Sequence, residues 1–77
     1  MEMYQISDEE NRRLAKDFTY HPPKADQVPR YNEIRSQAEA FAAGLMQMCP
    51  PSRERSLALT ALEEAVMWAN ASIARNE

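Results

Sequence analysis

A short segment at residues 18–24 combines aromatic, basic and rigid residues in a way that suits ligand binding. It reads Phe-Thr-Tyr-His-Pro-Pro-Lys and lies within residues 12–35, which carry six of the nine Lys and Arg residues but only three acidic ones. That window has a formal charge of +3 in a chain of net charge −3. The two prolines stiffen the segment, because each ring fixes its own φ and restricts the preceding residue. The pattern predicts a site for a small anionic ligand with flat faces, such as a nucleotide.

Two side chains are the leading candidates for contact with such a ligand. Tyr20 would offer its ring to a base, and stacking of a base on an aromatic ring contributes roughly 1–3 kcal/mol. The alternative is that Tyr20 anchors the loop on the helices. Arg35 projects to the border of the apolar face of the second predicted helix, where its planar fork suits a phosphate. The alternative for Arg35 is a salt bridge, either to Glu39 at i+4 or to another subunit.

Three further residues have weaker signals. His21 lacks metal ligands at suitable spacing and an orienting carboxylate, which favours loop packing over a role as the base of a hydrolase. Lys24 flanks the loop and either adds positive potential to a pocket or is a solvated charge. Arg75 shares the helix face of Trp68 and either reaches a ligand at an assembled interface or complements the helix dipole. Because the sequence shows no Gly-rich phosphate loop, zinc spacing or catalytic triad, we expect no enzyme, cofactor or metal site.

The elements that must position these residues are helices. Glycine occurs once, β-branched residues are sparse, and Ala, Glu, Leu, Met, Arg and Gln dominate, which favours helix over strand. Ser7 and Glu10 form a capping box that starts a short first helix. The pattern predicts an all-α fold in a single domain over residues 1–77, a short N-terminal helix plus a two-helix antiparallel hairpin. The helices are expected from Ser7 to near Asp17, from near Asp26 to about Met48, and from the Ser52 cap to about Arg75.

The apolar faces of the two longer helices are unequal. The predicted face of the second helix consists of Tyr31, Ile34, Ala38, Phe41, Ala42, Leu45 and Cys49, and the main stripe of the third consists of Ala58, Leu62, Ala65, Val66, Ala69 and Ile73. Leu57 and Trp68 project roughly 100° or more from that stripe. A two-helix hairpin buries one face of each helix, so this second face needs the first helix or another copy of the chain.

Length and composition restrict the class of protein further. A chain of 77 residues buries only about 60% of its unfolded surface, and small chains often compensate by oligomerising. The lone Cys49 fits a reducing cytosol, and no apolar run or export signal indicates a membrane span or secretion. The net charge of −3 argues against binding along DNA, which needs a broad positive surface.

Several of these residues also belong to motifs that point to a known family. The motifs are Phe18-Thr19-Tyr20-His21-Pro22-Pro23, Arg30-Tyr31, Ile34-Arg35, Pro51-Ser52-Arg53-Glu54, Leu59-Thr60, and the run from Leu62 to Asn76 that contains Met67-Trp68-Ala69-Asn70. From Phe18 to its end the chain resembles the small phage anti-CBASS sponge proteins, which sequester cyclic oligonucleotides. CBASS is a bacterial defence in which infection triggers cyclic di- and trinucleotide messengers.

The resemblance implies a helical subunit that assembles into a homohexamer. Such proteins bind cyclic dinucleotides between subunits, and many bind cyclic trinucleotides at separate sites. They do not cleave either ligand. By position, Tyr20 matches the base-stacking tyrosine, and Arg35 falls where the family has a phosphate-binding basic residue, often Lys. Lys24, Asn70 and Arg75 share only the local resemblance. The expected function is capture of cyclic dinucleotides in the cytoplasm of the host cell. The alternative is a helical interaction module that binds a host protein through the Trp68 face.

Overall fold

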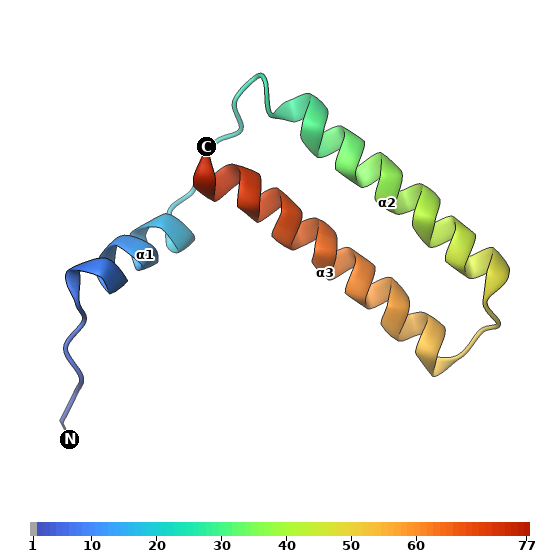
Figure 1. Ribbon diagram of the computed structural model, residues 1–77, viewed down its shortest axis with the longest axis horizontal. Coiled ribbons are helices and arrows are strands. Elements are labelled where there is room, and N and C mark those ends of the chain that lie inside the picture. Colours follow the sequence, from blue (N-terminus) through green and yellow to red (C-terminus); the bar gives the residue numbers. More distant parts are fainter. Residues whose placement is uncertain (1) are drawn as a thin grey trace.

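The structure, a computed structural model, describes residues 2–77 and contains three helices and no strand over that range. The helices are α1 (Asp8–Phe18), α2 (Val28–Met48) and α3 (Arg53–Asn76). α2 and α3 run antiparallel side by side, and α1 extends away from the end of the pair at which α3 ends (Figure 1). The predicted all-α fold, a short N-terminal helix followed by an antiparallel hairpin, is confirmed.

The start of α1 follows from its capping box. The Ser7 hydroxyl accepts the backbone N–H of Glu10 at 3.1 Å, and the Glu10 carboxylate accepts the backbone N–H of Ser7 at 3.0 Å. Two backbone donors that would otherwise lack partners are satisfied in this way. The same contacts lower the pKa of Glu10 from its ordinary value. The helix ends at Phe18, one residue beyond the expected end.

The turn between α2 and α3 closes the hairpin through local contacts. Cys49 is extended, because a residue before proline is disfavoured in the helical region, and α2 therefore ends at Met48. Ser52 caps α3 by accepting the backbone N–H of Arg55 at 3.1 Å. The Arg55 guanidinium donates to the carbonyl oxygens of Met46 at 3.1 Å and Cys49 at 3.2 Å. These bonds satisfy carbonyls at the end of α2, as the helix terminus requires.

The start of α2 differs slightly from the expectation. The helix begins at Val28 rather than near Asp26, and residues 25–27 form a turn. The reason is Gln27, whose side-chain oxygen accepts the backbone N–H of Lys24 at 3.0 Å and holds the preceding residues out of the helix. Pro29 lies in the first turn of the helix, as predicted, where its missing N–H costs no hydrogen bond.

The contact between α2 and α3 is one layer thick. On α2 the predicted positions are partly buried except Phe41, which is 59% exposed and lies outside the contact. On α3 the expected Ala58 and Ala65 are exposed, whereas Leu59 and Asn70 are partly buried. The partly buried α3 face therefore runs through Arg55, Leu59, Leu62, Val66, Ala69, Asn70 and Ile73. The predicted stripe of α3 was wrong at Ala58 and Ala65.

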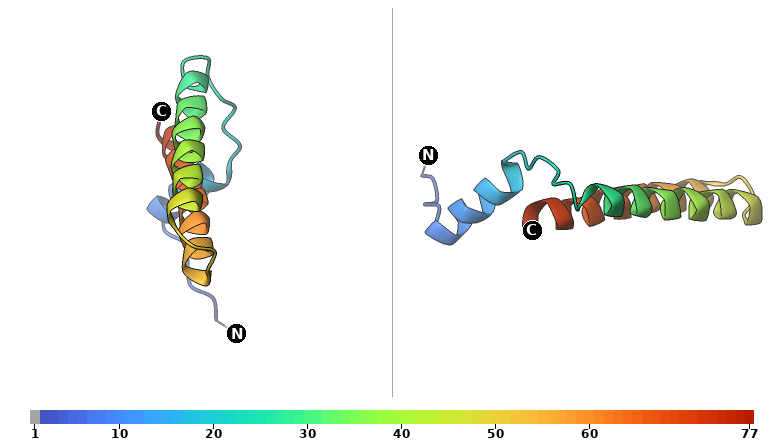
Figure 2. Two further views of the ribbon diagram at one scale, coloured as in Figure 1. Left: turned by 90° about the vertical axis from the view of Figure 1, so that its right-hand side faces the viewer. Right: turned by 90° about the horizontal axis from the view of Figure 1, so that it is seen from above.

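A single chain builds no closed hydrophobic core. No hydrophobic residue among residues 2–77 is fully buried; Leu57 and Trp68, on the second apolar face of α3, are exposed, and so is Met67. The chain is flat, with extents of 51 × 40 × 14 Å (Figure 2). Its radius of gyration is 17.5 Å, whereas a compact chain of this length has about 11–12 Å. Its accessible surface of 6700 Å² exceeds that of a typical folded monomer of its mass by about 1,900 Å².

Candidate functional site

The predicted site residues gather near one end of the hairpin, which we call the open end. Here the last turn of α1, residues 19–27 and the last turn of α3 meet, opposite the turn at Cys49–Ser52 (Figure 1). His21 Nε2 donates to the carbonyl oxygen of Lys16 at 2.7 Å, which satisfies one of the last carbonyls of α1. Lys16 Nζ in turn donates to Asn76 Oδ1 at 3.2 Å. These contacts attach both α1 and the loop to the end of α3.

His21 and Arg35 line the same hollow, which has a volume of about 440 Å³ and lies along α2 and α3. The other residues that line it are Pro23, Val28, Tyr31, Asn32, Asn70, Ala71 and Ala74. No carboxylate in the described range lies within ion-pair distance of Arg35, so the salt bridge to Glu39 is not formed. An arginine without a carboxylate partner, beside a mainly apolar hollow, can bind phosphate through its two parallel donors.

Asn70 contributes an unusual feature to the wall of this hollow. Its side-chain oxygen is buried and has no hydrogen-bond partner within residues 2–77. Buried polar atoms in folded proteins are nearly always paired, so this oxygen is an exception within the hairpin contact. Sequence reasoning assigned no role to Asn70. The only signal available there was a polar residue in line with Val66 and Ile73 on the helix.

Tyr20 lies outside every hollow described here. It is 80% exposed, and its ring is therefore not packed on the helices of its own chain. The interpretation of Tyr20 as an intramolecular anchor is not supported. A stiff loop that presents an uncovered ring is instead suited to stacking on a base or on another copy of the chain.

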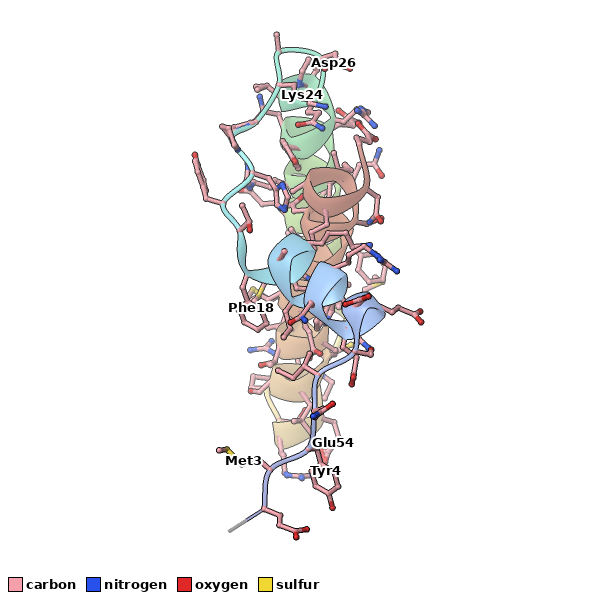
Figure 3. The ribbon with its side chains drawn as sticks, turned by 90° about the vertical axis from the view of Figure 1, so that its left-hand side faces the viewer. Met3, Tyr4, Phe18, Lys24, Asp26 and Glu54 are labelled. Carbon is pink, nitrogen blue, oxygen red and sulfur yellow. The ribbon has the colours of Figure 1, made fainter. Side chains whose placement is uncertain are left out.

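Lys24 and Arg75 line two other hollows. Lys24, at the turn before α2 (Figure 3), borders a hollow of about 300 Å³ together with His21, Gln27 and Glu77. Arg75 borders a hollow of about 380 Å³ between α1 and α3, with Arg13, Lys16, Asp17 and Trp68 among its lining residues. Its guanidinium contacts Asp17, at 3.7 Å from the carboxylate and 3.3 Å from the carbonyl oxygen. One subunit therefore brings His21 together with Arg35 and with Lys24, but places Tyr20 and Arg75 apart from them.

The hollow between α1 and α3 presents three cations, Arg13, Lys16 and Arg75, against one carboxylate, that of Asp17. His21 is bonded to a backbone carbonyl and not to a carboxylate. Within residues 2–77 no three His, Cys, Asp or Glu side chains are grouped as a metal site would need. None of the helices within residues 2–77 has the length and the apolar character needed to cross a membrane.

Comparison with known proteins agrees with the helical hairpin fold. Residues 10–74 match the family described as Acb2/Tad1, hairpin domain. The match covers most of the chain, and the protein therefore belongs to this family, the anti-CBASS sponges of cyclic oligonucleotides. At family level the function is sequestration of cyclic nucleotides by a binding protein. No curated protein and no solved structure gave a significant match.

Proposed function

We propose that this protein sequesters cyclic dinucleotides in pockets that form between copies of the chain, without cleaving them. The concentration of free cyclic dinucleotide would then be too low to activate the CBASS effector in the cytoplasm of an infected host. The observation that carries the proposal is the hollow lined by His21, Arg35 and Asn70, in which the Arg35 guanidinium has no carboxylate partner and can bind a phosphate. The exposed Tyr20 ring of a second copy can cover this hollow and stack on a base.

The exposed surface supports assembly. Thirteen large hydrophobic side chains among residues 2–77 are exposed, and they lie on all three helices, in the loop and in the N-terminal segment. The surface excess of about 1,900 Å² falls in the range that a subunit of an obligate oligomer covers, which is about 1,000–2,500 Å² per partner. We propose a homohexamer of single-domain subunits, in which cyclic trinucleotides occupy a separate site.

Native mass spectrometry with and without ligand tests the proposal directly. The protein is measured alone and with cyclic di-AMP, cyclic di-GMP, cyclic GMP–AMP and a cyclic triadenylate. We expect a hexamer that gains the mass of intact ligand, and intact ligand recovered after heat denaturation of the complex. A monomer that takes up none of these compounds refutes the proposal, and recovery of a linear product refutes its non-enzymatic character.

A protein-interaction module is the second candidate, supported by the face around Trp68. The indole is 61% exposed, although its N–H donates to Glu64 at 3.3 Å; the neighbouring Met67, and Leu57 about three turns earlier on α3, are also exposed. An aromatic anchor among apolar residues is typical of the centre of a protein interface. If Trp68→Ala abolishes capture of a host protein but leaves the oligomer and ligand binding unchanged, this second function is supported.

A further inference from the structure

Glu77 joins the open end to the start of α2 through contacts with two side chains. Its carboxylate oxygens accept both terminal nitrogens of Arg30, at 2.7 Å from Nη1 and 2.5 Å from Nη2. Its Oε1 also accepts the side-chain N–H of Gln27 at 3.3 Å. A bidentate pair of this kind fixes orientation as well as distance. Glu77 lies beyond residues 10–74, so the contact is not part of the matched family region.

The side chain of Gln27 links Glu77 to the loop before α2. Gln27 is 2% exposed and is the one fully buried residue among residues 2–77. Its side-chain oxygen accepts the backbone N–H of Lys24 at 3.0 Å, and its backbone N–H donates to the carbonyl oxygen of Lys24 at 3.0 Å. Both ends of the Gln27 amide are therefore used, one by the loop and the other by Glu77. A buried amide that loses one partner is destabilised, because its desolvation is no longer compensated.

The same contacts keep the Glu77 carboxyl group ionised. Hydrogen bonds from Arg30, and then from Gln27, lower the pKa of Glu77 from 4.5 to about 2. The carboxylate is therefore ionised throughout the physiological range, and the connection does not depend on pH there.

The loop has few other attachments. Residues 20–24 belong to no regular element, and the only other side-chain bond that ties them to a helix is that of His21 to Lys16 at the end of α1. Figure 3 shows Lys24 and Asp26 at the far end of this loop from Phe18. The loop is thus fixed at one end by His21 and at the other by Gln27 and Glu77.

We propose that Glu77 is a positioning residue, which acts through Gln27 and Arg30 to hold residues 20–24 in the arrangement that binds ligand. The inference rests on the proposed function, because it concerns the loop that presents Tyr20 and His21. When a loop is already ordered, its ordering entropy is not lost on binding. Without the connection, only a fraction of molecules carry the binding-competent loop, and the apparent affinity falls by that fraction.

The test compares Glu77→Leu with Glu77→Gln in the full chain. The probe is whichever of cyclic di-AMP, cyclic di-GMP and cyclic GMP–AMP the unmodified protein binds most tightly. We expect about a tenfold higher Kd for Glu77→Leu, mainly from a slower association rate, and about a threefold increase for Glu77→Gln, which keeps an oxygen for Gln27. Amide hydrogen exchange is measured at Tyr20, His21 and Lys24 of the ligand-free protein, because Pro22 and Pro23 carry no amide hydrogen. The exchange should be fastest in Glu77→Leu and intermediate in Glu77→Gln. Arg30→Gln provides an independent variant with the same expected direction if Glu77→Leu fails to fold.

The matched control is Glu54→Leu, which removes a carboxylate from α3 at the opposite end of the hairpin (Figure 3). It should leave both the Kd and the exchange of the loop unchanged. The inference is overturned if the Glu77 variants retain the affinity of the unmodified protein, if they weaken binding only through faster dissociation, or if they lose the oligomer. Failure of the unmodified protein to bind any of the three compounds refutes the proposed function itself, which distinguishes the two failures.

Discussion

The two ends of the hairpin are held together in different ways. At the turn end, Arg55 contacts the carbonyls of Met46 and Cys49, and Ser52 caps the helix that follows it. At the open end, Lys16 contacts Asn76, Arg30 contacts Glu77, and Asp17 contacts Arg75. The contacts of the turn end join residues at most nine positions apart, whereas these three contacts of the open end join residues at least 47 apart, in addition to the local bonds of His21 and Lys24.

Because of this difference, the turn end should mainly determine stability, and the open end should mainly determine ligand binding. The turn end can form as soon as its few residues are made, because its partners are local. The open end exists only after three distant segments have come together. It also contains the hollows that are lined by His21, Lys24, Arg35 and Arg75. We therefore expect substitutions at the open end to change ligand affinity, and substitutions at the turn end to change stability alone.

The largest effect is expected for Tyr20→Ala and Arg35→Ala. Loss of a stacked ring or of a bidentate phosphate contact, repeated on two subunits around one ligand, should weaken binding by about 100-fold. The measurement is isothermal titration calorimetry with the cyclic dinucleotide that binds most tightly. Tyr20→Phe is the control for Tyr20, because it keeps the ring and should keep most of the affinity. Unchanged affinity in both alanine variants, with the oligomer intact, would refute this assignment.

The sequence predicts the locally determined features of the fold well and those that depend on distant contacts less well. The start of α1 at Ser7 and the turn at Cys49–Ser52 were predictable, because capping and proline signals act over a few residues. The start of α2 was misplaced because the side chain of Gln27 holds the preceding turn, and Gln27 is in turn bound by Glu77, 50 positions away. No local pattern contains that information.

For the candidate site, the sequence suggested residues but not their arrangement. A rigid aromatic loop within a basic window predicts a ligand site near residues 18–24, and the structure places His21 and Arg35 in one hollow at the open end. Periodicity failed for Phe41, because a helix paired with one neighbour contacts it along a narrower strip than the whole apolar face. The orphaned oxygen of Asn70 is a tertiary property, because it depends on which side chains surround it.

Asn70→Leu should have the next largest effect. Leucine has nearly the same size but needs no hydrogen bond, so removal of the orphaned oxygen should leave stability unchanged or raise it. Asn70 also lines the hollow, and if its amide group contacts the ligand there, the same change should weaken binding by about tenfold. Calorimetry and thermal melting on one sample measure both quantities. A lower melting temperature with unaltered affinity would show that Asn70 serves the fold and not the ligand.

Arg55→Ala tests the turn end. Loss of the two bonds to the Met46 and Cys49 carbonyls should lower the free energy of unfolding by about 1 kcal/mol. Urea denaturation at one fixed protein concentration measures the change, because assembly makes stability depend on concentration. Ligand affinity should stay the same. A parallel loss of affinity would contradict the proposed separation between the two ends.

The smallest effect concerns acid stability at the open end. The pKa of Glu77 is about 2 in the folded chain, against 4.5 for a free glutamate, so its ionisation favours folding at every pH above 4.5. As the pH falls from 4.5 towards 2, the unfolded chain takes up the proton first and this contribution is lost. The difference in melting temperature between the unmodified protein and Glu77→Gln should therefore be constant near neutral pH and shrink in acid.

Arg55→Ala is the matched comparison for this measurement. The acceptors of Arg55 are backbone carbonyls, which do not titrate, so its effect on melting temperature should not follow the same acid transition. Arg30→Gln removes the chief cause of the shifted pKa and should suppress the acid dependence that distinguishes Glu77→Gln. If Glu77→Gln and the unmodified protein differ by the same amount across the acid range, the ion pair does not contribute in solution. The open end would then be held by its neutral hydrogen bonds alone.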